Sequence, residues 1–480
     1  MKRVISSLIL ISLLTSLFAC QETESDTIST TEATTSEAVQ AEYEYPELNL
    51  NGDSFTILNP TTTWGFYTYV DHEEQTGDTL DDAVYNRNRG LEERWNFKFD
   101  IVEEPLEECA AKIRSAVMSG DDVYDIVFNA STYNGSLVTE GLYCDLYDIP
   151  EFQLDKEWWE QSVIKESVIN GDSLYFALTD FTLFGIESAW CVFFNETMLA
   201  DLGLDRPYDL VREGKWTLDA LREYAKAGAN LNGDDSFDFN VDGNAVYGFA
   251  TSYAFPHAMI IGSGERYIAN SSDGYPEFAL ETDRFYTLVS KYADFASAAG
   301  EFVSRNNSGN DHYEMIFKNR RALFLGAELK AAQKYRDFDD TFGIVPVPKL
   351  DEAQDSYHSV ISKAAPVMCL PITNSDQATA GIIMDALTYE SYTDILPIFY
   401  GVTIEQKGLR NEESIEMLDI IRSTRFFDIG DAYGWTTSIQ DSIRRALDVG
   451  NDNIASIIAS NKDAVNAAIE ATMDLFNNQD

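Results

Sequence analysis

The sequence predicts an α/β protein with two lobes. Its 480 residues are too many for one ordinary hydrophobic core, and the hydrophobic share of 45% is enough to build real cores. Apolar segments of strand length alternate along the chain with segments of helical spacing. This alternation favours mainly parallel sheets in which helices connect successive strands.

The first third of the chain shows this alternation most clearly. SFTILNP is predicted as a buried strand, FKFDIVEE as a second strand and YDIVFNAS as a third. LEECAAKIRSAVMSG is predicted as a helix that ends at Gly120. DTLDDAVYNRNRGLEERWN has helical spacing, and one face of that helix would carry Leu80, Val84, Tyr85, Leu91 and Trp95.

The second half repeats the pattern. AWCVFFN, FGIVPVPK and APVMCLPIT are predicted strands, and RRALFLGAELKAAQKYR is a strand, a short loop and a helix. WTLDALREYAKAGANL is a helix with Thr217 as its N-cap and Ala220 at the third helical position. No repeat of 20–50 residues is found, which argues against a solenoid or a propeller.

The N-terminus is typical of a secreted protein. Lys2 and Arg3 precede VISSLILISLLTSLFA, an apolar run too short for a stable membrane span. We therefore expect a signal peptide over residues 1–19. The residues SLFAC resemble a lipobox, which makes Cys20 the first mature residue and the carrier of a lipid. The alternative is an ordinary signal peptide followed by a chance cysteine.

Residues 20–46 are predicted to form a flexible stalk. They are rich in Ser, Thr and Glu and poor in large apolar residues, so they cannot bury enough surface to become ordered. With a lipid on Cys20, the protein would be anchored at the outer face of the cell membrane. No later segment is long and apolar enough to span a bilayer.

The net charge excludes some classes of partner. The 81 acidic and 34 basic residues give a formal net charge of −47. Nucleic acid is a poor partner, because a phosphate-binding face needs Lys and Arg to release counterions. Anionic membrane surfaces are disfavoured for the same reason.

Catalytic and metal motifs are mostly absent from the sequence. No G-x-S-x-G elbow, Walker loop, G-x-G-x-x-G motif or H-E-x-x-H motif occurs, and no His has a second His or Cys at metal-ligand spacing. We therefore expect no catalytic residues and no cofactor. Glycoside hydrolysis needs only two carboxylates, however, so a surface glycosidase or lyase stays open as an alternative.

Four cysteines lie in the mature chain, at positions 109, 144, 191 and 369, without a C-x-x-C pair. Three disulfide pairings among them are possible, and sequence does not choose between these. We favour four buried thiols.

One loop, NLNGDDSFDFNVDGNAVYGF, offers oxygen ligands at alternate positions. Counted as a calcium loop of the EF-hand type, it lacks the closing acid in either register. The alternatives are a structural calcium site and an Asx-rich turn between a helix and a strand. The candidate ligands are Asn230, Asn232, Asp234, Ser236, Asp238 and Asp242.

Several segments of the mature chain together resemble one protein family. They are GKWTLDALREYAKAGANLNGD, DDAVYNRNRGLEERW, SGDDVYDIVF, DSLYFALTDF with AWCVFFNETMLADLGL, and FGIVPVPKLDEAQDSY. Their order and spacing resemble the family 1 extracellular solute-binding lipoproteins of bacterial ABC importers, which also carry an N-terminal lipid anchor. The calcium-like loop departs from the tidier loops of that family.

The resemblance implies a two-lobed periplasmic-binding-protein-like fold of type II, with a hinge and a ligand cleft between the lobes. Lobe one would hold residues 47–180 and 373–415, and lobe two residues 190–362 and 416–480. The chain would cross between them at 178–192 and 362–372. Ligands of open α/β sheets bind at the carboxyl ends of the strands.

The resemblance also implies an oligosaccharide ligand and a permease partner. The 7 Trp, 25 Tyr and 28 Phe can supply faces on which sugars stack. A peptide ligand is the alternative, and a structural adhesin would bind no small ligand. We expect a monomer. The predicted ligand-binding residues are Trp64, Asn129, Ser131, Asp180, Glu187, Glu328, Tyr433 and Trp435.

Overall fold

The computed structural model describes residues 43–272, 274–304, 312–335, 337–405 and 412–477. The chain divides into two compact units, Met1–Glu44 and Tyr45–Asp480, and the second unit contains the fold described below. The predicted signal peptide, Cys20 and most of the predicted stalk lie outside the described residues. Within the described ranges no helix has both the length and the apolar character needed to cross a membrane.

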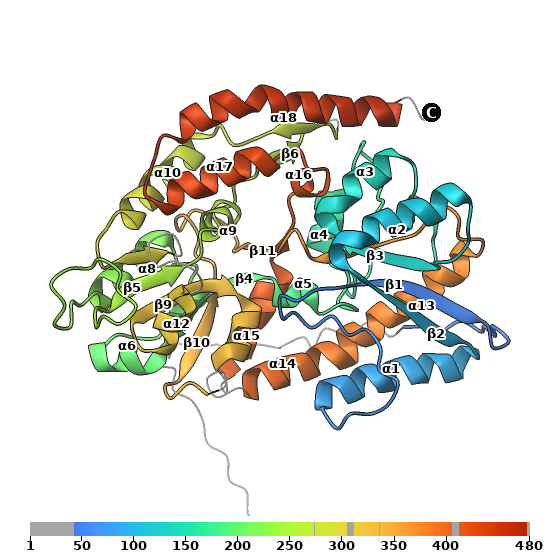
Figure 1. Cartoon of the computed structure of the whole chain (residues 1–480), viewed down its shortest axis with the longest axis horizontal. Coiled ribbons are helices and arrows are strands. Elements are labelled where there is room, and N and C mark those ends of the chain that lie inside the picture. Colours follow the sequence, from blue (N-terminus) through green and yellow to red (C-terminus); the bar gives the residue numbers. More distant parts are fainter. Residues whose placement is uncertain (1–42, 273, 305–311, 336, 406–411, 478–480) are drawn as a thin grey trace, which may run out of the picture. The chain divides into compact units, whose positions relative to one another are not determined.

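The first sheet has four strands in the order β12-β3-β1-β2 (Figure 1). β1 pairs in parallel with β2 and β3, whereas β12 runs antiparallel to β3. The strands span Ser54–Thr61 (β1), Lys98–Pro105 (β2), Ile126–Ala130 (β3) and Pro366–Cys369 (β12).

The second sheet has five strands in the order β10-β4-β9-β5-β8. β5 is parallel to β8 and β9, and β4 is antiparallel to both β9 and β10, so β4 is the reversed strand. The strands span Trp190–Asn195 (β4), Tyr247–Thr251 (β5), Phe302–Ser304 (β8), Ala322–Glu328 (β9) and Phe342–Pro346 (β10).

Both sheets are mainly parallel, as the sequence predicts, and each contains one reversed strand. β4 begins inside the predicted crossing 178–192, and β12 lies inside the predicted crossing 362–372. The reversed strands are therefore the ones adjoining the segments that pass from one sheet to the other. The exact hinge residues stay a prediction.

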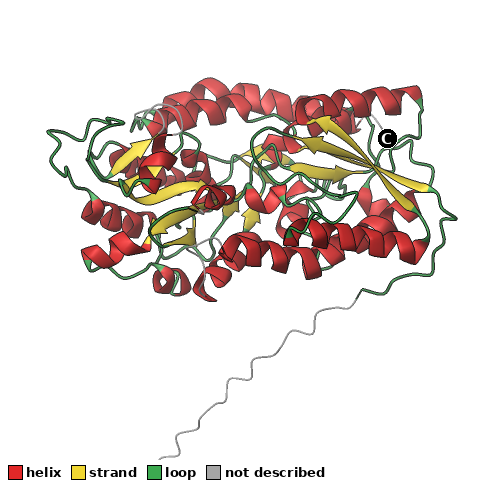
Figure 2. Cartoon of the chain, turned by 60° about the horizontal axis from the view of Figure 1, so that its bottom comes forward, coloured by secondary structure: helices red, strands yellow, loops and turns green. Residues whose placement is uncertain are grey.

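Helices cover both sheets, and Figure 2 shows them on either side of the strands. α2 packs on β1, β2 and β3, α8 and α12 on β5 and β9, and α15 on β10. The helices in the first half of the chain are α1 (Thr79–Trp95), α2 (Leu106–Ser119), α3 (Asn134–Thr139), α4 (Gln161–Ser167), α5 (Phe184–Glu187), α6 (Glu196–Leu202), α7 (Tyr208–Arg212) and α8 (Leu218–Gly228). Those in the second half are α9 (Phe255–Gly262), α10 (Asp283–Ala296), α12 (His312–Lys318), α13 (Gln377–Glu390), α14 (Leu396–Glu405), α15 (Glu412–Ser423), α16 (Ile429–Ala432), α17 (Thr437–Asp448) and α18 (Ile454–Asn477).

Shorter elements complete the fold. Two pairs of short strands are formed by β6 (Ile268–Asn270) with β7 (Pro276–Phe278), and by β11 (Ser359–Val360) with β13 (Arg425–Phe426). Single-turn or tight helices are η1 (Ser131–Tyr133), η2 (Leu146–Asp148), η3 (Leu329–Tyr335) and η4 (Ser391–Ile395). η3 replaces the regular helix that the sequence predicts after β9.

Local sequence signals are confirmed at several helix ends. Gly120 follows α2 with a φ of 74°, a left-handed conformation that glycine adopts without strain. The Thr217 side chain accepts a hydrogen bond from the backbone N–H of Ala220 and so caps α8. Of the five residues predicted to share one face of α1, Tyr85 is half-buried and the other four are buried.

The four cysteines of the mature chain are free thiols, as predicted, but the prediction that all four are buried is wrong for Cys144. Cys109, Cys191 and Cys369 are buried, and Cys144 is half-buried. Burial raises the pKa of the Cys144 thiol to about 11. The low thiolate fraction that follows makes it a poor nucleophile at neutral pH.

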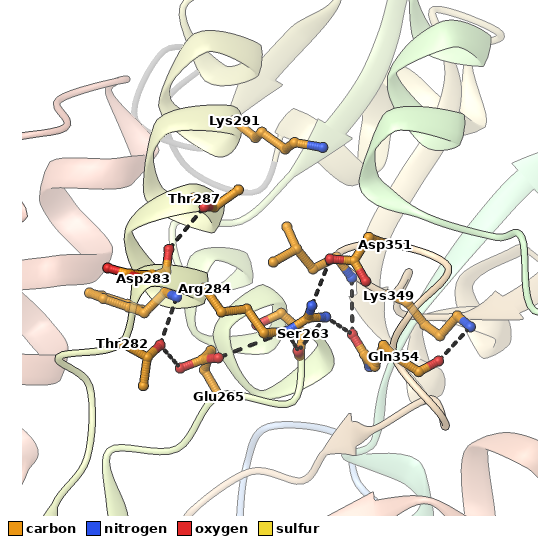
Figure 3. Close-up of polar contacts among 12 residues, drawn as sticks. Ser263, Glu265, Thr282, Asp283, Arg284, Thr287, Lys291, Lys349, Asp351 and Gln354 are labelled. Atoms are coloured by element: carbon orange, nitrogen blue, oxygen red, sulfur yellow. Dashed lines mark hydrogen bonds and ion pairs between the residues drawn. The ribbon is translucent and has the colours of Figure 1, made fainter.

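A polar network fixes the loop between β10 and β11. Figure 3 shows the guanidinium of Arg284, on α10, directed toward this loop, where it binds Asp351 Oδ2 (2.6 Å) and Gln354 Oε1 (3.1 Å). Gln354 in turn accepts at its backbone carbonyl from Lys349 Nζ (2.8 Å). The loop is thereby attached to α10. It continues into β11, after which the chain returns to the first sheet.

A buried ion-pair network joins Glu160 and the start of the first crossing, at Asp180, to β13. The guanidinium of Arg425 is fully buried and lies 2.8 Å from Asp180 and 2.6 Å from Glu160. Arg422, at the end of α15, lies 3.0 Å from Asp180. Burial opposes ionisation of Asp180, but the charges of Arg425 and Arg422 outweigh it and hold the pKa of Asp180 below its usual value.

Replacing Asp180 should therefore destabilise the fold strongly. Asp180→Asn leaves the buried Arg425 and the half-buried Arg422 with one carboxylate fewer, which costs about 3–5 kcal/mol when a buried pair is broken from one side. Urea unfolding followed by circular dichroism measures this change. Lys215→Ala is the control, because its ion pair with Glu213 is exposed and screened by water and should contribute little. Equal stability of Asp180→Asn and the parent would contradict the role given to the network.

Candidate functional site

A pocket of about 420 Å³ lies between the loop after β1 and the edge of the second sheet. Trp64 and Phe66 reach it from the first sheet, and Trp190 and Glu328 from the facing ends of β4 and β9. The remaining lining residues come from the loop after β5, from α12, from η3 and from the segment after β11: Ser252, Tyr253, Ala254, Tyr313, Glu314, Lys330, Ala331 and Ser362.

Aromatic side chains form much of the pocket wall. Trp64 is 55% exposed, so its ring is available to a ligand, whereas Trp190 is 8% exposed. Tyr253 contributes from the loop after β5 and Tyr313 from α12. Two arginines of α17 lie over the Tyr253 ring, at 5.3 and 5.8 Å from its centroid.

The carboxylates of the pocket are paired with lysines. Glu328 Oε2 lies 3.3 Å from Lys330 Nζ, and Glu314 is ion-paired with Lys334. Burial raises the pKa of Glu328, and the charge of Lys330 opposes that rise. The pocket therefore presents carboxylate oxygens as hydrogen-bond acceptors while its own cations balance their charge.

The segment Trp64–Tyr67, here called the strap, contacts η3 and α5. Lys330 Nζ donates to the backbone oxygen of Trp64 (3.2 Å) and lies 3.5 Å from the centroid of the Phe66 ring. Phe66 also stacks on Phe184 of α5, with ring centroids 3.9 Å apart. Gly65 has a φ of 80°, which lets the chain turn so that Trp64 and Phe66 both face the pocket.

Two of the predicted ligand-binding residues, Trp64 and Glu328, line the pocket. Glu187 lies beneath the strap, 1% exposed, where its Oε2 accepts from the backbone N–H of Tyr67 (2.5 Å) and its Oε1 from Gln333 Nε2 (2.7 Å). Asp180 belongs to the buried ion-pair network of the fold.

The other four predicted residues are engaged elsewhere and are not part of this pocket's lining. Asn129 Nδ2 donates to Asn134 Oδ1 (2.9 Å), and Ser131 Oγ donates to a backbone carbonyl at position 363 (2.7 Å). Tyr433 and Trp435 stack on each other with centroids 4.8 Å apart, and Trp435 is 5% exposed. Direct ligand contact by these residues stays a prediction.

The sequence analysis missed several lining residues for identifiable reasons. Tyr253 comes two residues after β5, so the expectation that ligands bind at the carboxyl ends of strands points to it as well as to Glu328 at the end of β9. Trp190 is the first residue of its strand, whereas that expectation concerns residues at the carboxyl ends of strands. Because β4 is reversed, its start lies opposite Glu328 at the end of β9. Tyr313 and Lys330 carry no comparable signal.

The calcium-like loop is held by its own hydrogen bonds. Asp234 Oδ2 accepts from the backbone N–H groups of Asn244 (2.7 Å) and Ala245 (2.8 Å), and these bonds hold the pKa of Asp234 below its usual value. Arg321 donates to three backbone carbonyls of the loop, at positions 240, 241 and 245. In the described ranges no group of three or more His, Cys, Asp or Glu side chains is placed to hold a metal ion. Calcium binding stays a prediction.

The fold is shared with known sugar-binding proteins. A sugar transporter from Rhizobium etli in an open conformation is similar over 86% of this chain and 99% of that chain, with 13% identity and a TM-score of 0.60. A cyclo/maltodextrin-binding protein complexed with maltotetraose matches 88% of this chain and 97% of that chain, at 13% identity and a TM-score of 0.58. No model of a protein family matches the sequence, and no curated protein sequence matches it.

A third similar structure is the galacto-N-biose-/lacto-N-biose I-binding protein of an ABC transporter from Bifidobacterium longum, in complex with lacto-N-biose. It matches 88% of this chain and 98% of its own, with 11% identity and a TM-score of 0.57. At identities this low the likeness establishes the fold. It confirms the predicted two-lobed α/β architecture of periplasmic-binding-protein type.

Proposed function

We propose that the protein is an extracytoplasmic binding protein that captures an oligosaccharide in the pocket beneath the strap and delivers it to the permease of an ABC importer. The observation that carries this proposal is the pocket wall itself. An exposed Trp64 ring, two tyrosines and two lysine-paired carboxylates surround one space between two α/β sheets. Aromatic faces suit the C–H faces of sugars, and carboxylate oxygens accept from their hydroxyls.

The similar structures support the same ligand class. By their descriptions, one holds maltotetraose, and another holds lacto-N-biose as part of an ABC transporter. The balanced charges of the pocket also suit a neutral ligand, because Lys330 and Lys334 already neutralise the two glutamates. We infer a monomer that works without a cofactor and does not bind nucleic acid.

A surface glycosidase is the second candidate, because the pocket contains two carboxylates. The charge of Glu314 contributes to the raised pKa of Glu328. A glycosidase uses such a pair as acid and base. Here, however, each carboxylate has a lysine partner, which favours a binding role.

A ligand screen separates binding from catalysis. We expect maltotetraose, lacto-N-biose or another member of an oligosaccharide panel to raise the melting temperature, because a ligand that binds the native state stabilises it. The same mixtures, incubated and examined by mass spectrometry, should contain the intact sugar. Cleaved product would support the glycosidase. A rise in melting temperature with peptides alone would show that the ligand is a peptide and not a sugar.

Trp64 should contribute a large part of the affinity. Trp64→Ala removes an exposed ring from the pocket wall, and loss of such an anchor weakens binding by about tenfold or more. Isothermal titration with the sugar found in the screen measures this. Tyr147→Ala is a matched control, since Tyr147 is 46% exposed and does not line the pocket. Equal affinities of the parent and Trp64→Ala would show that Trp64 does not contribute to ligand binding.

Lipid attachment at Cys20 would hold the protein at the outer face of the cell membrane, after removal of residues 1–19. We expect Cys20→Ser to shift the protein from the membrane fraction to the soluble or secreted fraction, because the acyl chains supply the membrane affinity. Fractionation and immunoblotting of producing cells measure this shift. A mutant that stays in the membrane fraction as fully as the parent would contradict lipid anchoring at this residue.

A further inference from the structure

We propose that Trp190 is a specificity-determining residue of the pocket: its indole N–H donates to an oxygen of the ligand beside Glu328, and the two side chains together bind neighbouring hydroxyls of a sugar. This inference rests on the proposed function and deepens it, because it assigns a hydrogen bond to a side chain of the pocket wall. Its first part, an indole N–H that is open to the pocket, is testable without any ligand.

The buried tryptophans differ in the partner of the indole N–H. Trp190 is 8% exposed, yet its Nε1 donates to no described residue. The other buried tryptophans each donate to an oxygen of the chain, at distances between 2.6 and 3.1 Å: Trp95, Trp158, Trp159, Trp216 and Trp435. Because a buried indole N–H usually has a hydrogen-bond partner, the exception at Trp190 indicates an acceptor from outside the chain.

The surroundings of Trp190 show where such an acceptor can come from. The residue lines the pocket, and its ring lies against Phe255, with centroids 6.0 Å apart. Its Nε1, which has no partner among the described residues, is not fully enclosed by protein atoms. A ligand that excludes water from this nitrogen leaves the N–H unpaired, at a cost in free energy, unless the ligand itself accepts a hydrogen bond. The pocket therefore favours a ligand with an oxygen at this point.

Glu328 supplies an acceptor beside this donor. It is the direct partner of Trp190 in the antiparallel pair of β4 and β9. Directly opposite residues project from the same face of a sheet, with Cβ atoms about 4.5–5.5 Å apart. Glu328 Oε2 lies 3.3 Å from Lys330 Nζ, whereas Oε1 has no hydrogen-bond donor among the described residues. One open donor and one open acceptor therefore lie side by side at the edge of the second sheet.

Two neighbouring hydroxyls of a sugar ring complement this pair. A hydroxyl both donates and accepts, so one hydroxyl can donate to Glu328 Oε1 while the oxygen of the next accepts from Trp190 Nε1. A ligand without one of these hydroxyls would leave the N–H or the carboxylate unpaired, and sites built for a hydrogen bond reject such analogues strongly. The pair therefore selects a polyhydroxylated ligand, whereas the exposed Trp64 ring offers a face for stacking.

Nuclear magnetic resonance of the indole groups tests both parts. Of the 7 Trp signals in ¹⁵N-labelled protein, that of Trp190 is the one that disappears in Trp190→Phe. In the ligand-free protein we expect its N–H to exchange with water about tenfold faster or more than that of Trp216, which is fully buried and bonded to the Pro346 carbonyl. Saturation with the panel sugar that raises the melting temperature, with maltotetraose and lacto-N-biose tried first, should move the Trp190 proton signal downfield and slow its exchange by about tenfold or more.

Affinity measurements separate the N–H from the ring that carries it. Trp190→Phe removes the donor, whereas Trp190→His keeps one, because Nε2 of histidine occupies the place in its five-membered ring that Nε1 has in indole. At about pH 8, where histidine is neutral, we expect Kd for that sugar to rise about tenfold in Trp190→Phe and to recover several-fold in Trp190→His. Trp216→Phe is the matched control: it removes an indole N–H that bonds within the chain, so it should lower the melting temperature and leave Kd unchanged.

Three results would overturn the inference while the proposed function stands. Slow exchange of the Trp190 N–H without ligand would show that it has a partner inside the protein. A sugar that binds without changing the Trp190 signal, or with equal affinity for the parent and Trp190→Phe, would show that the N–H does not contact it. Equal affinities of Trp190→Phe and Trp190→His would assign the loss to ring packing. If no sugar of the panel raises the melting temperature, the proposed function fails and the sugar contact fails with it, whereas exchange in the ligand-free protein still decides whether the N–H is open to the pocket.

Discussion

The buried guanidinium of Arg425 connects parts of the chain that are far apart in sequence. A charge without water is costly unless it is paired, and Arg425 is paired with both Asp180 and Glu160. β13, which carries Arg425, can therefore be buried because those two carboxylates lie beside the guanidinium. β13 then pairs with β11, and the chain after β11 reaches Ser362, whose backbone N–H donates to the Ser188 hydroxyl (3.3 Å). The two crossing segments thus lie together, and the pocket forms at their side.

Lysines next to the pocket carboxylates reduce the charge repulsion that is expected in a strongly acidic protein. With a formal net charge of −47, unbalanced carboxylates inside a pocket would repel each other. Lys330 and Lys334 lie next to Glu328 and Glu314, so the acceptor oxygens remain while the local charge is balanced. Lys330 also covers Phe66 and holds the Trp64 carbonyl. One lysine therefore links the charge balance of the pocket to the position of its most exposed aromatic ring.

A position at or after the end of a strand predicts some of the pocket residues and fails for others. Ser131 follows the parallel strand β3, yet its hydroxyl donates to a backbone carbonyl and does not line the pocket. Glu328 ends a strand that runs parallel to its neighbour β5, and its side chain lines the pocket. Trp190 begins a reversed strand and is not among the predicted residues, although it lies opposite Glu328 at the same edge of the second sheet. Trp435 has Gly and Thr as neighbours in the sequence and not an apolar stripe, and this favours a ring that is available to a ligand. Its ring is covered by Tyr433, and its Nε1 donates to Thr472 of α18 (2.9 Å), a contact 37 residues away in sequence.

The sequence by itself determined the local elements of this protein and its α/β class. Helix caps such as Thr217 and Gly120, and the apolar face of α1, act over a few residues, so their effect is readable from neighbouring letters. Burial of Asp180, the strap over Glu187 and the lysine partners of Glu314 and Glu328 were decided by tertiary structure. Each depends on segments that meet only after folding, and the energy of a buried charge is set by what lies within a few ångströms of it in space.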